Sequence, residues 1–383
     1  MTKSKQSKSN RGNEPKALTK LKLCARAGGR CQFEGCNKKL FIDGITLTEL
    51  NNSNIAHIVA SSPDGPRGNE HSYELSDEIE NLMLMCQEHH KLIDDNPEVY
   101  TTQLLQNMKN EQEIKIEELL NEMNYPKSEI IMFESPIKNQ MNVKVNFKQT
   151  VDAVRASGYN PASNHGVSIT INSSEDYRSS RYWESVERDL IDKVNYQIES
   201  LYRCSPDLQL AIFPIAPIPL IVKLGNILGD KRKIDIYQKF REPDTWKWQS
   251  TELLNSFSTE KNEISKGDKI ALVISVTSNI DLERVTHVDK FDVIYHLKAQ
   301  NFGINAIQSV KDLEAFWQEY LSICEKIKNV DKASEISLFP AIPVSIAFEI
   351  GRRYMPKVYP KMRVFDECDG FFETIKIGGK IDE

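Results

Sequence analysis

The sequence lacks a long hydrophobic run. Its longest apolar stretch, Leu210–Val222, has 13 residues and includes three prolines. A helix that crosses a bilayer needs about 20 apolar residues, so this stretch is too short and too interrupted to cross one. The first sixteen residues contain no apolar segment like that of a secretory signal. We therefore expect a cytoplasmic protein that does not enter a membrane.

The sequence also lacks the paired cysteines of a secreted, disulfide-bonded protein. The chain has 383 residues and seven cysteines, and an odd number without a signal segment argues against a disulfide framework. Hydrophobic residues make up 40% of the chain and charged residues 27%, which excludes a chain that is disordered throughout. The length predicts two or three domains.

A net positive charge is absent as well, which by itself argues against binding to nucleic acid. The formal net charge is −6, but residues 1–40 hold eleven Lys and Arg and only two Asp and Glu. This stretch therefore carries +9 and the other 343 residues carry −15. Local potential governs contacts with phosphates, so the stretch is a candidate DNA-contacting arm. For residues 1–17 we expect a basic flexible tail, and a purely solubilising role remains the alternative.

The first compact unit is expected over residues 18–123. It should end in a helix over about 100–123, because apolar residues recur there at helical spacing. The simplest interpretation of this stripe is core packing, and its members are Leu104, Leu105, Met108, Ile116, Leu119, Leu120 and Met123. Asn124-Tyr125-Pro126 would break the helix. Residues 124–165 are expected to be a connector with extended segments at 130–133 and 143–147.

The remaining residues, 166–383, contain an internal repeat. A shift of 126 positions aligns 210–225 with 336–351. The identical pairs are Phe213 with Phe339, Pro214 with Pro340, Pro217 with Pro343, and Gly225 with Gly351. The alternative is coincidence between two buried, proline-flanked strands. We expect two halves, about 166–260 and 268–383.

Each half is predicted to alternate strands with helices. The expected strands are 167–171 and 234–237 in the first half, and 270–276 and 362–365 in the second. Amphipathic helices fit between them, at about 183–201 and 312–327. This alternation predicts parallel sheets with ligand-accepting loops at the carboxyl ends of the strands.

Cysteine and histidine cluster near the N-terminus of the chain. Four of each lie between residues 24 and 90, namely Cys24, Cys31, Cys36, Cys86, His57, His71, His89 and His90. The close pairs Cys31/Cys36 and Cys86/His89 suit a tetrahedral structural zinc site, since thiolate and imidazole favour zinc over magnesium. Buried free cysteines are the alternative. Cys24 is a spare thiol that could replace one of the four ligands.

Three further residues stand among these pairs in a fixed order, His57, Asn81 and His90. This order, with the zinc-like pairs interleaved, resembles the HNH endonuclease family over about residues 20–110. The resemblance implies a zinc-stapled ββα-metal fold of the α+β class. It also implies a metal-dependent DNA endonuclease, a phosphodiester hydrolase.

The chemistry of phosphodiester hydrolysis suits these residue types. A neutral imidazole can deprotonate water near pH 7, and His57 is our candidate base. A divalent cation such as Mg²⁺ would offset charge on the phosphate, with His90 as its ligand, and Asn81 would hold the loop that bears His57. Ala56 stands where the family commonly has an acidic metal ligand, so the second ligand is open between Asp94 and His71. Taken singly, each histidine is more often structural.

The repeat-bearing region carries a second resemblance. The motifs 339–343 and 351–353, the strand 271–277 and the earlier copy at 213–225 resemble the SAVED domain, an α/β sensor of two fused CARF-like Rossmann halves. An HNH domain followed by SAVED resembles a CBASS antiphage effector. That resemblance implies a nuclease that stays inactive until a cyclic oligonucleotide, made by a partner CD-NTase nucleotidyltransferase, binds SAVED. Binding would drive homo-oligomerisation and degradation of double-stranded DNA.

A cyclic di- or trinucleotide offers flat bases and an anionic ring, so its pocket needs stacking aromatics and cations. Tyr237, Trp246 and Trp248 are candidates for stacking, Arg352 for a phosphate contact, and Thr277 for a hydrogen bond at a strand end. For the tryptophans, core packing is the alternative.

Two other functions remain open. The first is a constitutive restriction-type HNH nuclease whose C-terminal domain recognises DNA, although the acidic C-terminal region argues against a DNA-binding role. The second is a zinc-stapled scaffold without catalysis, which would bind a nucleotide or a protein.

Overall fold

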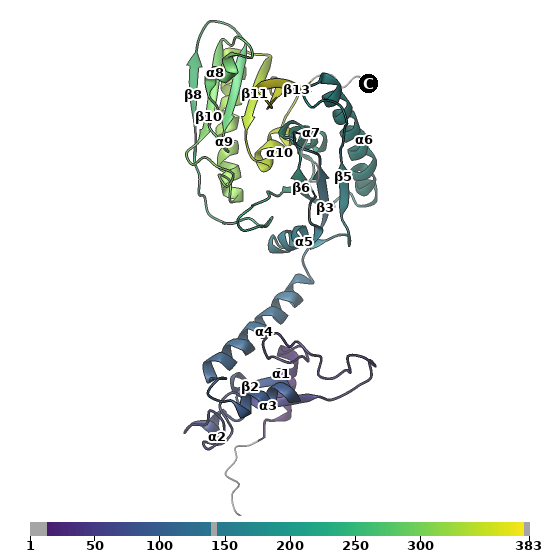
Figure 1. Ribbon diagram of the computed structural model, residues 1–383, viewed down its shortest axis with the longest axis vertical. Coiled ribbons are helices and arrows are strands. Elements are labelled where there is room, and N and C mark those ends of the chain that lie inside the picture. Colours follow the sequence, from purple (N-terminus) through teal and green to yellow (C-terminus); the bar gives the residue numbers. More distant parts are fainter. Residues whose placement is uncertain (1–13, 139–143, 379–383) are drawn as a thin grey trace, which may run out of the picture. The chain divides into compact units, whose positions relative to one another are not determined.

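The computed structural model describes residues 14–138 and 144–378. The chain divides into an N-terminal unit, residues 1–124, and a C-terminal unit, residues 125–383. Figure 1 shows the elements of each. Among the described residues, no helix combines the length and the apolar character that crossing a bilayer requires.

The N-terminal unit is built around two antiparallel strands followed by a helix. Strand β1 (Ser53–His57) pairs with β2 (Leu82–Cys86), with His57 opposite Leu82. Strand β2 is buried along its whole length and leads directly into α3 (Gln87–Asp95). The remaining elements are α1 (Ala17–Arg26), α2 (Ser72–Leu75), the 3-10 turn η1 (Ile79–Asn81) and α4 (Thr102–Glu122).

Helix α4 confirms the predicted helix but only half of its predicted packing. It begins at the Thr101 cap, whose side chain accepts a hydrogen bond from the Leu104 amide. Leu105 and Met108 are buried in the core of the unit. Leu119 and Met123, by contrast, are 56% and 76% exposed. The core of this small unit reaches only the first half of the helix, so core packing was wrong for the second half.

The C-terminal unit contains two sheets. The first has five parallel strands, which are β4 (Asn160–Pro161), β3 (Lys127–Glu134), β6 (Gln209–Ile215) and β7 (Ile234–Ile236) in spatial order, with β5 (Val167–Thr170) also paired to β3. Its helices are α5 (Phe147–Ala156), α6 (Ser180–Cys204) and α7 (Ile218–Leu228). A buried apolar face runs along α6, as its sequence periodicity predicted.

The second sheet has six strands. In spatial order they are β13 (Phe371–Ile377), β12 (Lys361–Glu367), β11 (Glu335–Ala341), β9 (Ile270–Ser275), β10 (Val293–Ala299) and β8 (Phe257–Glu263). The four central strands are parallel, and the two edge strands, β13 and β8, are antiparallel to their neighbours. Its helices are α8 (Leu282–Thr286), α9 (Val310–Lys326), which continues into a π turn, and α10 (Val344–Arg352).

The two halves follow the same path. The first runs β3-α5-β5-α6-β6-α7-β7 and the second runs β9-α8-β10-α9-β11-α10-β12. In both sheets the first strand lies between the second and the third, and the fourth lies beside the third. The alternating α/β architecture predicted from the repeat is therefore present, with Gly225 and Gly351 in equivalent helices.

One part of the predicted organisation differs. Residues 124–165 were expected to be a connector, yet they contain β3, whose central residues are buried between β5 and β6. Strand β3, not the segment at 167–171, is the counterpart of β9. The halves are therefore about 127–236 and 257–377. The repeat is recognisable only around β6–α7 and β11–α10, where both copies are buried, so it did not reveal β3.

The second expected extended segment, 143–147, is also different. Residue 143 lies outside the described residues, and Phe147 begins α5. The Asn146 side chain caps this helix by accepting hydrogen bonds from the amides of Lys148 and Gln149. An Asn before an amphipathic segment is a helix start signal, and it outweighed the local apolar alternation.

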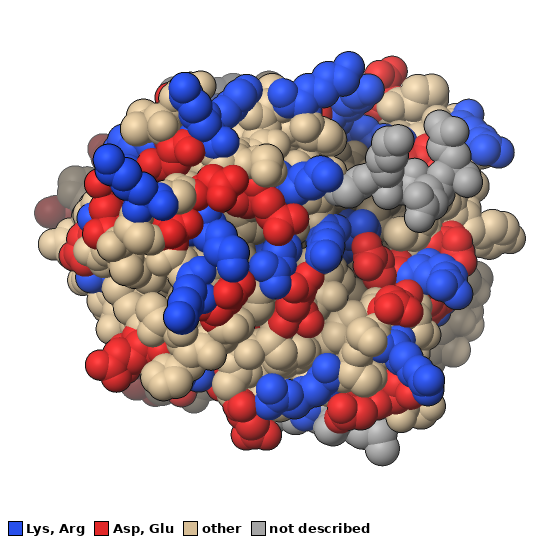
Figure 2. All heavy atoms as spheres, turned by 90° about the horizontal axis from the view of Figure 1, so that it is seen from above, with Lys and Arg blue, Asp and Glu red and all other residues tan. Residues whose placement is uncertain are grey.

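Charged side chains of both signs are interspersed on the face of the molecule drawn in Figure 2. Ion pairs of the C-terminal unit join the two signs directly, as in Arg284 with Glu367 at 3.0 Å and Lys298 with Glu260 at 2.7 Å. This face therefore offers no broad surface of one charge, although the whole chain is acidic.

Candidate functional site

The predicted zinc ligands lie together in the N-terminal unit. The side-chain ligand atoms of Cys31, Cys36, Cys86 and His89 are all within 4.8 Å of one another. The Sγ atoms of Cys31 and Cys86 are 3.9 Å apart, and His89 Nδ1 lies 3.2 Å from Cys86 Sγ and 3.7 Å from Cys31 Sγ. Two sulfurs bound to one tetrahedral zinc at about 2.3 Å are about 3.8 Å apart. The cluster therefore fits a zinc ion.

Local structure explains why these ligands meet. Cys86 ends β2 and caps α3, so His89 lies in the first turn of that helix, on the same side as the thiol. The ring of Phe33 stacks on the His89 ring at 4.1 Å and fixes its orientation. Burial raises the pKa of the Cys31 thiol to about 12, so the thiol stays protonated at neutral pH unless a cation replaces the proton. Cys24 is not a member of the cluster.

A groove of about 730 Å³ in the same unit contains the predicted catalytic histidines. His57, His90 and Asp94 line it together, and we call it the histidine groove. Its other polar lining residues include Lys20, Asn54 and Ser62. His57 comes from the end of β1, whereas His90 and Asp94 come from one face of α3. His71 lies outside the groove, exposed beside Glu70 and Glu74.

Hydrogen bonds define the orientation of His57. Its Nε2 lies 3.1 Å from the backbone oxygen of Ser76. A carbonyl oxygen can only accept, so Nε2 carries the proton in the neutral ring, and Nδ1 is then the basic nitrogen.

Asn81 holds the loop that follows His57, as the sequence predicted for this residue. Its Oδ1 accepts from the Val59 amide at 2.8 Å, and its Nδ2 donates to the Val59 oxygen at 2.9 Å and to the Leu75 oxygen at 3.1 Å. The side chain is buried. These bonds tie the segment that follows β1 to Leu75, the last residue of α2. Leu75 is next to Ser76, whose oxygen contacts His57.

A residue that the sequence did not single out holds Asp94, one of the residues that line this groove. The side chain of Arg67 is 5% exposed, and its guanidinium is 3.1 Å from Asp94 Oδ1. It also donates to the backbone oxygens of Ile58, directly after β1, and of Ile93 in α3. Arg67 lies in a Gly/Pro-rich loop without a recognised motif, so only its place in the fold reveals it.

The C-terminal unit has a cavity of about 500 Å³ at the carboxyl ends of β6 and β11. Its walls come from both halves, with Pro214 to Ala216 on one side and Ile342 to Val344 on the other. Thr277, predicted as a ligand contact, is one of its lining residues, together with Lys239 and Arg241. We call it the inter-sheet pocket.

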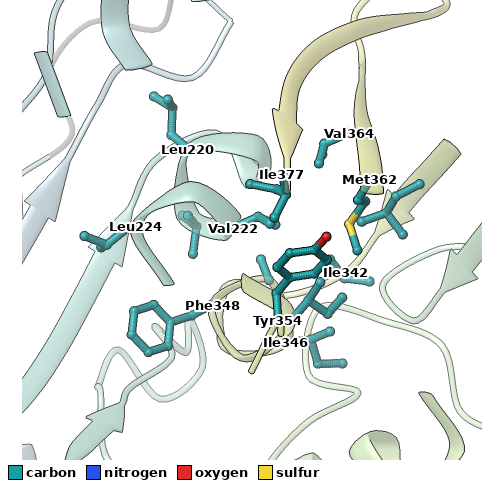
Figure 3. Packing of buried hydrophobic residues seen from close by; sticks show 14 of the residues in the cluster. Leu220, Val222, Leu224, Ile342, Ile346, Phe348, Tyr354, Met362, Val364 and Ile377 are labelled. Atoms are coloured by element: carbon teal, nitrogen blue, oxygen red, sulfur yellow. The ribbon is translucent and has the colours of Figure 1, made fainter. Parts of the chain in front are cut away.

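Helices α7 and α10 lead away from this pocket and pack directly on each other. A Cβ atom on Gly225 would lie 2.2 Å from the Phe348 oxygen, and one on Gly351 would lie 1.8 Å from the Val222 oxygen. Only glycine permits so close an approach of two backbones. Figure 3 shows the surrounding apolar cluster, which includes Leu220 and Leu224 of α7 and Phe348 of α10. The glycines that define the repeat therefore form the contact between its two copies.

Gln238 links the two halves at the pocket wall. Its Nε2 donates to the Ile307 oxygen at 3.1 Å, and its Oε1 accepts from Ser345 Oγ at 2.7 Å. Ser345 lies in the first turn of α10, and Gln238 follows β7. The pocket is therefore braced by a buried bond between the halves.

The other predicted ligand-binding residues do not line this pocket. Tyr237 and Trp246 are each 1% exposed and pack on Phe213, with ring centroids 4.5 Å and 5.3 Å away. Tyr237, Trp248 and Arg352 line a different cavity of about 270 Å³, where Arg352 donates to Glu349 Oε2 at 3.2 Å. Trp246 is therefore a core residue, which was the alternative interpretation for it, whereas Tyr237 packs in the core and also borders this second cavity. The sequence could not distinguish the buried aromatic side chains from the accessible ones, because aromatic residues of both kinds follow a short strand.

Comparisons with known proteins bear on the C-terminal unit. Residues 187–377 match the SAVED family, described as the SMODS-associated and fused to various effectors sensor domain. This match supports a SAVED sensor domain in the C-terminal unit. No curated protein matches the chain.

Solved structures of Cap4 SAVED/CARF-domain containing receptors are similar to this chain at low identity. The Acinetobacter baumannii receptor with the cyclic trinucleotide 2'3'3'-cAAA is 13% identical, with a TM-score of 0.43, and the match covers 80% of this chain and 66% of that one. The Moraxella osloensis receptor is also 13% identical, with a TM-score of 0.39 and coverages of 76% and 60%. The chain thus spans about two thirds of the length of these receptors.

Proposed function

We propose that this chain is an antiphage effector of the CBASS type, a metal-dependent HNH-type DNA endonuclease that a cyclic oligonucleotide activates. The observation that carries the nuclease assignment is the histidine groove, in which His57 and His90 face one space from two different elements. The SAVED match over residues 187–377 supports the sensor assignment.

In the proposed reaction, His57 is the general base. Its Nε2–H is directed at the Ser76 oxygen, so Nδ1 takes the proton from the attacking water as that water bonds to phosphorus. The bond from phosphorus to the leaving oxygen breaks in the same displacement, and the leaving oxygen takes a proton from solvent water. The Asn81 bonds to Val59 keep the ring in place during this transfer. His90 would hold a divalent cation such as Mg²⁺. When bound, that ion offsets the charge that develops on the phosphate and the leaving oxygen.

The inter-sheet pocket is the proposed sensor site. Its cavity combines apolar walls, which suit flat bases, with the cations of Lys239 and Arg241, which suit phosphates. Helices α7 and α10 begin at its rim, and a helix N-terminus favours an anion. We propose a cyclic di- or trinucleotide as activator, made by a partner CD-NTase nucleotidyltransferase.

Activation requires that the ligand bind an assembled, active form better than the inactive chain. We propose homo-oligomerisation as that step. It would gather several basic N-terminal stretches at one DNA duplex, and each stretch alone contributes little in a chain of net charge −6.

Plasmid cleavage tests the proposal directly. Purified protein with Zn²⁺ and Mg²⁺ should degrade double-stranded DNA only after the matching member of a panel of cyclic di- and trinucleotides is added. Size-exclusion chromatography with light scattering should show assembly under the same condition. Cleavage at the full rate without any nucleotide would refute the gating and favour the constitutive nuclease. The mixed charges in Figure 2 give that alternative no basic surface on the face shown.

A thermal-shift screen tests the sensor separately from catalysis. A ligand present at 100 times its Kd stabilises by about 2.7 kcal/mol. The substitutions Lys239→Ala and Arg241→Ala should each weaken the response by about tenfold in Kd, whereas the exposed Lys247→Ala, outside the pocket lining, should leave it unchanged. Binding that is intact in the first two variants would remove the inter-sheet pocket as the site. A chain that binds nucleotide but never cleaves DNA would favour the scaffold.

A further inference from the structure

Arg67 joins the two elements that supply the histidine groove. Its Nε donates to the Ile58 oxygen at 2.7 Å, directly after His57 at the end of β1. Its Nη1 donates to the Ile93 oxygen at 2.6 Å, on α3. Its Nη2 lies 3.1 Å from Asp94 Oδ1 and 3.4 Å from the His57 oxygen. One buried guanidinium therefore fixes the spacing between the base and the helix that bears His90.

The backbone at Arg67 is strained, and its surroundings hold it so. Its φ is +57°, in the left-handed region that residues with a side chain rarely adopt. The loop is compact as well, because a Cβ on Gly68 would lie 2.3 Å from the Pro63 oxygen. Strain of this kind persists only where the rest of the structure over-determines it, and it clusters at functional sites.

The carboxylate that Arg67 holds lies beside His90. Asp94 Oδ2 is 3.8 Å from His90 Nε2, and both side chains are about one third exposed toward the groove. Adjacent ligands of an octahedral Mg²⁺ at about 2.1 Å lie about 3.0 Å apart, so a side-chain shift of about 1 Å or less brings the pair onto one ion. Ala56, at the position where the family commonly carries an acidic ligand, is fully buried and outside the groove lining.

We propose that Asp94 is the carboxylate ligand of the divalent cation, beside His90, and that Arg67 is the positioning residue that orients Asp94 and spaces it from His57. This inference rests on the proposed nuclease function. Arg67 bonds one carboxylate oxygen, Oδ1, and leaves Oδ2 directed at the His90 ring. Such partners behind a ligand fix its orientation and account for roughly 10- to 100-fold in metal affinity or activity.

Mn²⁺ binding tests the proposal without DNA or an activator. The full chain, loaded with zinc, would be titrated with Mn²⁺ and followed by electron paramagnetic resonance of the free ion. Asp94→Asn should raise the Kd of the groove site by roughly 10- to 100-fold or more, and Arg67→Gln by roughly 10-fold. The neighbouring Asp95→Asn, exposed and outside the groove lining, should match the wild type. Unchanged affinity in Asp94→Asn overturns the ligand assignment.

Arg67 needs a second measurement, because its loss also removes structural bonds. Arg67→Lys keeps the charge but cannot make the forked contacts, so Mn²⁺ affinity should stay reduced in both Arg67→Lys and Arg67→Gln at an unchanged zinc content, which reports that the N-terminal unit is folded. Arg26→Gln, on the exposed face of α1, is the charge control. Full recovery of Mn²⁺ affinity in Arg67→Lys would overturn the positioning role.

Cleavage assays distinguish the two levels of the proposal. If activated wild type cuts DNA while Asp94→Asn and Arg67→Gln cut at the wild-type rate, this inference fails and the nuclease function stands. If wild type binds Mn²⁺ in the groove but cuts no DNA with any activator, the nuclease function fails. The cleavage rate should be at least tenfold lower in both variants and should rise with Mn²⁺ concentration. That result supports the nuclease function and this inference together.

Discussion

The two units of this chain are held together by different means. The buried cluster of the N-terminal unit is small, and it includes the zinc-site thiols Cys31 and Cys86 themselves. The C-terminal unit has an apolar cluster that extends through both sheets, from Ile131 to Ile377. Small cores are marginal without a metal or a disulfide. The comparison teaches that packing stabilises the C-terminal unit, whereas the small N-terminal core contains four candidate ligands through which a zinc ion would stabilise it.

Removal of the zinc site should give the largest difference between the units. Cys86→Ser, or treatment with a strong chelator, should unfold the N-terminal unit, because structural zinc contributes an apparent 10–16 kcal/mol or so in zinc-dependent domains. The C-terminal unit should keep its melting transition. Calorimetry of the full chain would resolve the two transitions.

Cys24→Ser is the matched control, since Cys24 is partly buried in the same unit but outside the cluster. Its effect should stay near 1 kcal/mol. Metal analysis should find one zinc per wild-type chain and much less in Cys86→Ser. A single joint unfolding transition on chelation would contradict the separate stability of the two units.

His57→Ala should be the next largest effect, and it should fall on catalysis alone. Loss of a general base costs about 10²- to 10⁴-fold in rate. Nucleotide binding by the C-terminal unit and zinc content should be unchanged. The control is His71→Ala, an exposed histidine outside the histidine groove, which should cleave normally. A variant at position 57 that retains more than a tenth of the activity would exclude the base role.

In contrast to His57→Ala, Gly351→Ala should leave the N-terminal unit unchanged and destabilise only the C-terminal unit. Its new Cβ would meet the Val222 oxygen at 1.8 Å, and the backbones of α7 and α10 would have to separate. We expect a loss of about 3 kcal/mol in the free energy of unfolding. Gly225→Ala should behave alike, and the double variant should lose less than the sum, since both open one contact.

Gly44→Ala, in the N-terminal unit, meets nothing within 4 Å and should change stability by less than about 0.5 kcal/mol. For the Gly225 and Gly351 variants, urea unfolding followed by tryptophan fluorescence is a suitable measurement, because all four tryptophans lie in the C-terminal unit. Calorimetry of the N-terminal transition measures Gly44→Ala. Strict additivity of the two glycine variants would show that the repeated glycines do not share one contact.

Mild acid should weaken the C-terminal unit by the smallest amount of this series. Burial lowers the pKa of His296 to about 4, with Lys298 acting in the same direction and Glu260 against it. The folded state then binds fewer protons than the unfolded state between about pH 4 and 6.5, so this contribution is complete above pH 6.5 and is lost as the pH falls toward 4. We expect a loss of about 2 kcal/mol.

His296→Gln should flatten that pH dependence, and the exposed His287→Gln should not. In the wild type, the Ser275 hydroxyl accepts from the Ile280 amide and lies 2.8 Å from His296 Nε2, a buried site that disfavours the charged ring. Melting temperatures of the C-terminal unit between pH 4.5 and 8 would measure the effect. Equal slopes in wild type and His296→Gln would show that other groups control the acid response.

For the N-terminal unit, the sequence predicted the clustering of metal-ligand side chains better than it predicted which apolar residues are buried. Two ligand pairs at short spacing were enough to bring four zinc ligands together, and the order of His57, Asn81 and His90 was enough to place two of them in one groove. Such motifs depend on fixed local geometry. Arg67 was not predicted, because its contacts are with residues 9 to 27 positions away in the sequence. No recognised motif has that spacing.

For the C-terminal unit the situation was reversed. Periodicity and the repeat predicted alternating strands and helices, and the structure has them. The pocket residues were mostly missed, since Lys239 and Arg241 lie in a loop and Tyr237 faces the core. Which side of a short strand faces a cavity depends on how two sheets pack, and no local pattern encodes that.

The glycine contact between α7 and α10 has a kinematic consequence. Gly225 and Gly351 each lie seven residues beyond the first residue of their helix, a distance of about 10 Å along the axis. The inter-sheet pocket lies at the N-terminal ends of the same two helices. The glycine contact can therefore act as a common pivot point, at the same distance from the pocket along each helix. If each helix moves as a rigid body, a rotation of about 10° at the pivot point displaces its pocket end by about 2 Å. A change in the width of the pocket would then require a matching change in the angle between the two sheets.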